Sequence, residues 1–120
     1  METISIFLQI VIALGVINVW ILRFNKGSSW RGGKARNMKE EFKIYGLPGW
    51  FVGVIGFLKL LFATALLAGI WYPVLVAPAA IGMGILMIGA IGMHIKIKDQ
   101  LKKSVPAFTM LVMSVLVYLF

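Results

Sequence analysis

A single lysine lies in the middle of an apolar run and is the first residue of this sequence that could bind a ligand. The run extends from Leu47 to Trp71. It is long enough to cross a bilayer as a helix, because a hydrocarbon core about 30 Å thick requires about 20 apolar residues. A lysine at that depth costs about 2.5–3.5 kcal/mol on insertion scales, so Lys59 needs a compensating partner. The acidic residues of the chain are expected at or beyond the membrane surfaces: Glu2, Glu40, Glu41 and Asp99.

Several arrangements would accommodate the Lys59 side chain. The amine can be neutral, or it can hydrogen-bond to Gln9 of the first apolar run or to backbone carbonyls. The side chain can also extend along the helix toward the membrane surface. These arrangements are structural. In the remaining one the amine contacts an oxygen of a bound molecule, such as a quinone carbonyl or a lipid phosphate, and Lys59 is then a ligand-binding residue.

A second polar group is expected where the third apolar run reaches the membrane surface. His94 and Asp99 flank its inner end, and an imidazole can relay protons because it titrates near neutral pH. The alternative is a structural histidine that is hydrogen-bonded to Asn18 or to a loop carbonyl. Gln9 and Asn18 are the polar side chains of the first run and can form interhelical hydrogen bonds. The candidate ligand-binding residues are therefore Lys59, Gln9, Asn18, His94 and Asp99.

Other kinds of site are not expected in this chain. It contains no cysteine, so disulfides, thiolate metal sites and thiol redox chemistry are excluded within it. One histidine cannot form a zinc or haem site alone, so no metal site is predicted. A nucleophile, a base and an orienting residue are not found at a common depth, and the apolar runs hold no paired carboxylates. A stand-alone enzyme is therefore not expected.

The composition is typical of an integral membrane protein. Of the 120 residues, 61% are hydrophobic and 13% are charged. A soluble domain is about half apolar and about a quarter charged, and one of this length could not bury so much apolar surface. The net charge of +8 lies between apolar runs, which favours anionic lipid headgroups rather than nucleic acid as its partner.

Four apolar runs predict an all-α fold, a four-helix transmembrane bundle that forms a single domain over residues 1–120. The expected spans are residues 3–22, 48–71, 74–94 and 105–120. The third span is rich in Ala and Gly, so it is expected to be the most enclosed helix. Gly49 and Gly53 form a G-x-x-x-G motif that favours close packing of helices, and Trp20 is expected at the headgroup boundary.

A short amphipathic helix is expected between the first two spans, in the membrane interface. Asn37 can cap its N-terminus, with Glu40 three residues later as the reciprocal partner. Gly46 provides a stop. Three residues at helical spacing form its apolar stripe: Met38, Phe42 and Tyr45.

Basic residues in the polar loops set the expected orientation. Residues 23–46 hold seven Lys or Arg and residues 95–104 hold four, whereas the second loop and both termini hold none. The positive-inside rule therefore predicts a plasma (inner) membrane protein with both of these loops in the cytoplasm and both termini outside. The residues expected to bind anionic lipid headgroups at the cytoplasmic face are Arg31, Lys34, Arg36, Lys39 and Lys43.

Several short motifs resemble the DoxX-like family of small four-helix membrane proteins. They occur in order between about Asn18 and the C-terminus, and include Arg31-Gly32-Gly33, Glu40-Glu41-Phe42, Tyr45-Gly46-Leu47-Pro48, Leu58-Lys59-Leu60-Leu61, Gly89-Ala90 and Pro106-Ala107. The resemblance implies a four-helix membrane fold and little about activity. The naming member of the family is a subunit of an archaeal thiosulfate:quinone oxidoreductase, and a wider kinship includes receptor-assembly chaperones of animal membranes.

Two functions are carried forward as hypotheses. The first is a non-enzymatic accessory or assembly protein, which binds another membrane protein, a second copy of itself or a lipophilic ligand between its helices. No resident cofactor is expected in this case. The alternative is a quinone-linked membrane subunit of a redox complex, similar to a thiosulfate:quinone oxidoreductase, with Lys59 and His94 holding the quinone head. A small transporter is disfavoured, because the spans show no inverted repeat and contain one ionisable residue.

Overall fold

The described part of the chain folds into four long α-helices and one short α-helix. A computed structural model describes residues 2–22, 24–25, 32–33, 35–99 and 101–120. The α-helices are α1 (Glu2–Ile17), α2 (Met38–Ile44), α3 (Gly49–Ala68), α4 (Val76–Lys96) and α5 (Val105–Leu119). A π-helical turn, Asn18–Leu22, extends α1, and 3-10 turns at Pro73–Leu75 and Leu101–Ser104 precede α4 and α5. The predicted all-α architecture is confirmed.

Four continuous helical segments are long and apolar enough to cross a membrane. They are Thr3–Leu22, Gly49–Ala68, Pro73–Lys96 and Leu101–Leu119. Their ends fall at residues that stop or restart a helix, such as Pro48 before α3 and the pair Tyr72 and Pro73 before α4. The side chains that point away from the bundle are mostly apolar, as is usual for a surface that faces lipid.

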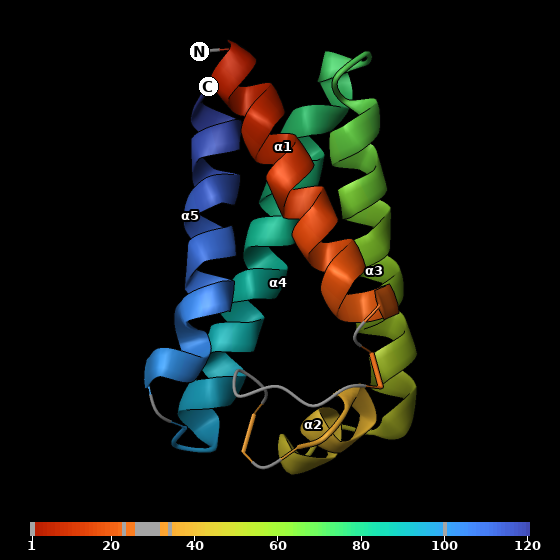
Figure 1. The fold of residues 1–120 in the computed structure, drawn as a ribbon, viewed down its shortest axis with the longest axis vertical. Coiled ribbons are helices and arrows are strands. Elements are labelled where there is room, and N and C mark those ends of the chain that lie inside the picture. Colours follow the sequence, from red (N-terminus) through yellow and green to blue (C-terminus); the bar gives the residue numbers. More distant parts are fainter. Residues whose placement is uncertain (1, 23, 26–31, 34, 100) are drawn as a thin grey trace.

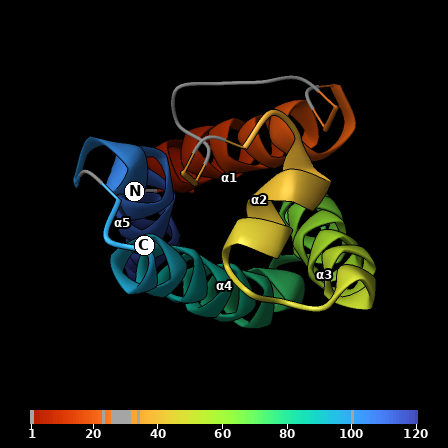
Figure 2. The same cartoon turned by 90° about the horizontal axis from the view of Figure 1, so that it is seen from below.

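Both described ends of the chain lie at the same end of the bundle as the tight α3–α4 turn, whereas α2 lies across the opposite end (Figure 1). Between these ends α1 crosses the bundle diagonally, from beside α5 near the N-terminus to beside α3 near its C-terminus. Seen along the bundle, α1, α3, α4 and α5 surround a common axis, and α2 lies over α3 and α4 (Figure 2). The two loops that join α1 to α2 and α4 to α5 are thereby brought to one end.

The bundle is closed near the termini and open near α2. Close to the termini, four fully buried side chains come from four different helices: Ile12, Leu66, Met83 and Val117. Toward α2 the α1–α3 pair diverges from the α4–α5 pair (Figure 1). Two glycines on the same face of α4 show the difference. A Cβ atom at Gly82 would lie 2.4 Å from the Phe62 ring, whereas one at Gly89 would meet nothing within 4 Å.

The packing of three features differs from what the sequence suggests. α4 is not the most enclosed helix: 28% of its most apolar 18-residue window is buried, against 33% for α1. Ile85 and Gly89 of α4 are exposed in the open half. Cβ atoms at Gly49 and Gly53 would meet nothing within 4 Å, so this motif packs against no described helix of the chain. Trp20, which is expected at the headgroup boundary, is 7% exposed and packs inside the bundle.

The predicted helix between the first two spans is present as α2, and its N-terminal cap is confirmed. The Asn37 side chain accepts a hydrogen bond from the Glu40 backbone N–H at 2.9 Å and donates one to the Glu40 carboxylate at 3.1 Å. Gly46 follows the helix with φ of +81°, a conformation that favours glycine. The predicted apolar stripe is buried against the bundle: Met38, Phe42 and Tyr45.

Candidate functional site

A cavity of about 470 Å³ lies between the helices in the open half of the bundle. Most of its lining is apolar and comes from all five helices, including Val16, Phe51, Ile55, Met87 and Met110. Its polar lining residues are Asn18, Glu41, Tyr45, Lys59, His94 and Lys103. A cavity with an apolar wall and a few converging polar groups is the usual form of a small-molecule site.

Lys59 reaches this cavity from the middle of α3. Its amine lies 5.3 Å from the centroid of the Trp20 ring, within the range of a cation–π contact. It forms no side-chain hydrogen bond or ion pair with the residues that the structure describes. Glu41 lines the same cavity and attracts the Lys59 charge. Glu41 is therefore a carboxylate that shares the cavity with Lys59.

Trp20 is positioned by the π-helical turn at the end of α1 and by a glycine on α3. A Cβ atom at Gly56 would lie 2.8 Å from the Trp20 ring, so only a glycine lets the indole pack flat against α3. The Phe24 and Phe42 rings hold its other sides, at centroid distances of 6.1 and 5.9 Å. π-Helical turns are frequent at functional sites, and this one directs an aromatic face toward Lys59.

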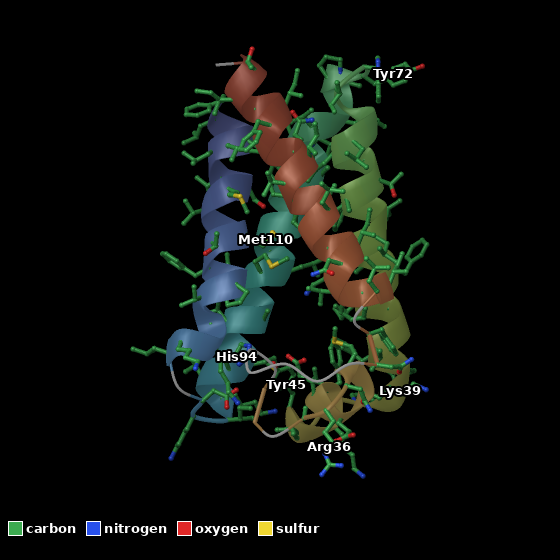
Figure 3. The ribbon with its side chains drawn as sticks, in the orientation of Figure 1. Arg36, Lys39, Tyr45, Tyr72, His94 and Met110 are labelled. Atoms are coloured by element: carbon green, nitrogen blue, oxygen red, sulfur yellow. The ribbon has the colours of Figure 1, made fainter. Side chains whose placement is uncertain are left out.

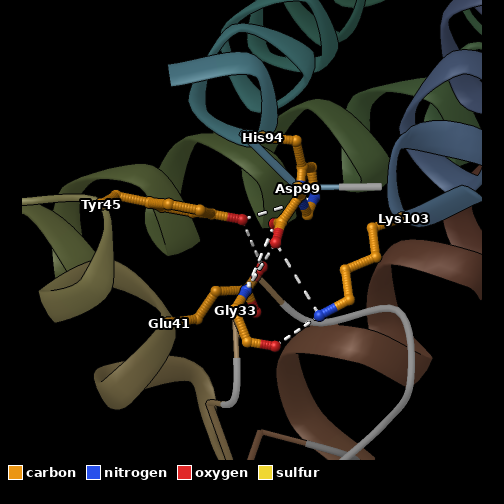
Figure 4. Close-up of polar contacts among 6 residues, drawn as sticks. All are labelled: Gly33, Glu41, Tyr45, His94, Asp99 and Lys103. Carbon is orange, nitrogen blue, oxygen red and sulfur yellow. Dashed lines mark hydrogen bonds and ion pairs between the residues drawn. The ribbon is translucent and has the colours of Figure 1, made fainter. Parts of the chain in front are cut away.

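Four side chains from α2 and from the end of α4 form a continuous polar chain beside the cavity (Figure 4). The Tyr45 hydroxyl donates to Glu41 Oε1 at 2.7 Å, and its oxygen lies 3.4 Å from His94 Nε2. On the other side of the ring, His94 Nδ1 lies 2.8 Å from Asp99 Oδ2. Figure 3 places Tyr45 and His94 at the α2 end of the bundle. We refer to Glu41, Tyr45, His94 and Asp99 as the polar chain.

Asp99 ends the polar chain and fastens the first loop to the corner between α4 and α5. The Gly33 N–H donates to both of its oxygens, at 3.0 and 3.2 Å, and Lys103 Nζ lies 3.8 Å from Oδ1. Lys103 also donates to the Gly33 carbonyl. Burial of the Asp99 carboxyl acts to raise its pKa, but the hydrogen bonds from His94 and Gly33 and the Lys103 charge together hold that pKa below its ordinary value of 3.8.

Glycine is required at both positions of this attachment. Gly33 has φ of +56°, a backbone conformation that side chains other than glycine rarely adopt. A Cβ atom at Gly32 would lie 2.6 Å from the Tyr45 ring, so this residue lets the loop approach the polar chain. Lys96 adds a further contact by donating to the Tyr45 carbonyl at 2.9 Å. Gly32 and Gly33 therefore lie against the polar chain, through Tyr45 and Asp99 respectively.

Comparison with protein families identifies the chain. A family model described as the DoxX-like family matches residues 16–117. The chain belongs to the DoxX-like family. Searches of curated proteins and of solved structures find no match. The family, together with the four apolar helices, makes this an integral membrane protein.

In this DoxX-like protein, three of the candidate ligand-binding residues line the cavity: Asn18, Lys59 and His94. Asp99 lies behind His94 in the polar chain. Gln9 lies elsewhere, in the closed half, where its amide donates to the Leu66 carbonyl at 2.7 Å and accepts from Ser5. The proposed bond between His94 and Asn18 is not formed, because the imidazole contacts Tyr45 and Asp99 instead.

The basic residues expected to bind headgroups divide into two groups. Arg36, Lys39 and Lys43 are exposed at the α2 end, and Figure 3 shows Arg36 directed away from the bundle. Arg31 and Lys34 lie outside the described residues. Within the described ranges, no group of three or more His, Cys, Asp or Glu side chains could hold a metal ion.

Sequence reasoning missed four residues of the site in this DoxX-like protein: Trp20, Glu41, Tyr45 and Lys103. Helical spacing places Tyr45 in an apolar stripe, whereas its hydroxyl is the centre of the polar chain. The available signal was the spacing of Glu41 and Tyr45, four residues apart on one helix face. Trp20 and Lys103 carried no such signal, because their positions depend on Gly56 and Gly33, which are distant in sequence.

Proposed function

We propose that this DoxX-like protein is a non-enzymatic membrane protein that binds a lipophilic molecule in the cavity between its helices. An oxygen-bearing head of that molecule contacts Lys59. The observation that carries the proposal is the Lys59 amine itself, which lies in the wall of a largely apolar cavity, against the Trp20 ring and without a hydrogen-bonding side chain among the described residues. An amine in such surroundings binds an oxygen acceptor strongly, because water does not compete for it.

The form of the cavity supports a ligand with one polar end and a long apolar part. Its volume of about 470 Å³ lies within the range of sites for drug-sized molecules. Some lining residues are also exposed on the outside of the bundle: Asn18, Val19 and Pro106 between α1 and α5, and Ile85 and Gly89 on α4. Since these positions lie in or beside membrane-spanning segments, a lipophile can enter sideways from the bilayer.

Lys59→Met tests the proposal, because methionine keeps the length of the side chain and removes the amine. The wild type, Lys59→Met and the control Lys39→Met are purified in mild detergent and examined by native mass spectrometry. Lys39 is exposed on α2 and does not line the cavity. We expect a small lipophilic molecule on the wild type and on Lys39→Met, and its loss from Lys59→Met. A wild-type protein that carries no such molecule, or a Lys59→Met protein that retains it fully, contradicts the proposal.

A quinone-linked subunit of a redox complex is the second candidate. The observation that favours it is the presence of Tyr45 and His94 in the same cavity as Lys59, because a hydroxyl, an imidazole and an amine can together hydrogen-bond the carbonyls of a quinone ring. Extraction of the bound molecule and its identification by mass separates the two candidates. A quinone supports the redox subunit, and any other lipid supports the accessory protein.

The surface of the bundle supports a proposal for a protein partner, and the basic residues support one for the orientation. Gly49 and Gly53 leave room for another transmembrane helix to approach, either of a second copy or of another membrane protein.

Both termini are proposed to lie outside the plasma (inner) membrane, with Arg36, Lys39 and Lys43 against anionic headgroups at the cytoplasmic face. Reporter fusions after Tyr72 and after Phe120 should both report an external position, and a cytoplasmic signal from either contradicts this orientation.

A further inference from the structure

The floor of the cavity lies where the open half of the bundle meets the closed half. Side chains from three helices contribute to it: Val16, Met87 and Met110. One turn nearer the termini, the next buried residues of the same helices belong to the closed half and do not line the cavity: Ala13, Met83 and Ser114. The packed closed half therefore limits the depth of the cavity.

Met110 is the residue of this floor that can change position most easily. Val16 and Met87 are buried in the packed bundle, whereas Met110 is only partly buried. A methionine side chain is unbranched and flexible, so it can fill spaces of different shape. Figure 3 shows Met110 midway along the bundle, between the termini and α2. Its position therefore decides how much room remains at the floor.

A glycine on α1 provides the space that the tip of Met110 occupies. A Cβ atom at Gly15 would overlap the Met110 methyl group, so this side chain lies directly against the α1 backbone. The contact closes the gap between α1 and α5, since Val19 and Pro106, one turn nearer α2 on the same helices, are exposed and line the cavity. A larger residue at position 15 would displace the flexible end of Met110, and the cavity that Met110 lines is the space into which it can move.

The floor lies away from the α2 end, toward which the Lys59 amine extends. Side chains on a helix lean toward its N-terminus, and α3 begins at the α2 end of the bundle (Figure 1). The amine accordingly faces the Trp20 ring. Lys59 and Met110 belong to α3 and α5, which lie on opposite sides of the bundle axis (Figure 2). A lipophile whose head contacts Lys59 therefore has the apolar space between the amine and Met110 for its tail.

We infer that the contact between Gly15 and Met110 sets the length of the apolar tail that this cavity accepts. The inference rests on the proposed function and specifies its ligand class as a single unbranched tail below an oxygen-bearing head. A tail that ends short of Met110 leaves apolar lining uncovered, which is unfavourable. A longer tail must displace Met110 or leave the cavity between the helices. Binding should therefore be strongest at one tail length.

A series of saturated monoacylglycerols, from octanoyl to octadecanoyl, tests this inference on the intact protein. Each has one unbranched tail and an uncharged head whose hydroxyl and ester oxygens can accept a hydrogen bond from Lys59. The homologues are added as an equimolar mixture to protein in mild detergent, after extraction of bound lipids. Native mass spectrometry then counts each homologue on the protein. Detergent micelles solvate all of the tails, so selective retention by the protein reports the fit of the tail.

For the wild type we expect one homologue to be retained most, with less retention of shorter and of longer tails. Lys59→Met should retain every homologue less than the wild type does. If the wild type retains none, or if Lys59→Met retains them fully, the proposed function and the inference are both overturned. If the wild type retains all tail lengths alike and Lys59→Met loses them, the inference is overturned while the proposed function stands.

Two substitutions should change the preferred tail length in opposite directions. Gly15→Ala pushes Met110 into the cavity, so the most retained homologue should be shorter by one or two members of the series. Met110→Ala deepens the cavity, so the most retained homologue should be longer. In the double variant the side chain that Gly15→Ala displaces is missing, and its preferred length should match that of Met110→Ala.

Gly92→Ala is the matched control. This glycine of α4 is exposed and does not line the cavity, and a Cβ atom there would meet nothing within 4 Å, so the preferred length should equal that of the wild type. A preferred length that does not increase in Met110→Ala overturns the inference, and this variant carries the test alone if Gly15→Ala does not fold. A shortening by Gly15→Ala that persists in the double variant also overturns it, because the effect then does not act through Met110.

Discussion

Gln9 and Lys59 are both polar residues inside apolar helices, yet their surroundings differ. Gln9 lies in the closed half of the bundle at 2% exposure, and its amide group is hydrogen-bonded to Ser5 and to the Leu66 carbonyl. Lys59 lies in the open half, where its described neighbours offer it the Trp20 ring and the charge of Glu41 but no side-chain hydrogen bond. A polar residue within the membrane therefore indicates a ligand site only when its own chain does not satisfy it.

The difference between the halves arises from how α4 meets its neighbours. Near the termini, Gly82 lets the Phe62 ring of α3 pack directly on the α4 backbone. Two turns later, Gly89 also lacks a side chain, but α3 has diverged from α4 there. No atom would lie within 4 Å of a Cβ atom at Gly89, and this residue lines the cavity. The closed half is held by close packing, whereas the open half is bridged by α2 and by the polar chain.

The largest expected effect comes from breaking the contacts of Asp99 with Gly33 and His94, which hold the open half together. Asp99→Asn removes the carboxylate that accepts from Gly33 and His94, so we expect unfolding in detergent to become easier by about 1.5–3 kcal/mol, the range for hydrogen bonds to a charged group. Hydrogen exchange should accelerate in the described residues from Gly32 to Gly46 and remain unchanged in the closed half. Glu40→Gln, at an exposed carboxylate, is the control and should cost about 0.5 kcal/mol or less. Faster exchange throughout the bundle would show that the two halves are one cooperative unit.

The same variant gives a pH signature. The pKa of Asp99 is lower in the folded protein than its ordinary value of 3.8, so the ionised carboxylate stabilises the fold above about pH 4. This contribution is lost as the pH falls through the lowered pKa of the folded state. The wild type should therefore lose stability on acidification below about pH 4, and Asp99→Asn should lose less over the same interval. Identical acid profiles of the two proteins would contradict the role given to Asp99.

Sequence patterns predicted the elements of this protein well and its site only in part. Hydropathy and capping residues are local, so the four apolar helices, the Asn37 cap and the Gly46 stop could all be predicted. The site depends on contacts between distant residues. Trp20 packs on Gly56, and Asp99 binds Gly33, which is 66 residues away along the chain. Neither pairing leaves a periodic signal, so the sequence predicts neither the contact of Trp20 with Gly56 nor the polar chain.

A pair of glycine substitutions on one face of α4 tests the division into halves. Gly82→Ala places a methyl group 2.4 Å from the Phe62 ring, so the ring must move and we expect a loss of about 1–3 kcal/mol in the free energy of unfolding. Gly89→Ala meets no atom within 4 Å and should change the stability by about 0.5 kcal/mol or less. The measurement is thermal unfolding of both variants in the same detergent. Equal losses would mean that α4 is packed alike along its length.

The smallest expected effects come from substitutions of Gln9 and Lys59. The sign of the change in the free energy of unfolding distinguishes the two residues. Gln9→Leu leaves the Ser5 hydroxyl and the Leu66 carbonyl without their partner, so it should destabilise the bundle by about 1 kcal/mol, the scale of side-chain hydrogen bonds in membranes. Lys59→Met removes an amine that no described side chain hydrogen-bonds, so stability should be unchanged or increased by about 1 kcal/mol.

Both variants are compared with the wild type by unfolding in detergent after extraction of bound lipids, so that a lost ligand does not count as lost stability. If Lys59→Met is destabilised as much as Gln9→Leu, the lysine stabilises the bundle in the same way as the glutamine. The proposed difference between a structural Gln9 and a ligand-binding Lys59 is then contradicted. If the two changes have opposite signs, Lys59 carries a cost that folding alone does not require. Such a cost is the usual mark of a group retained for binding, because sites often contain groups that destabilise the free protein.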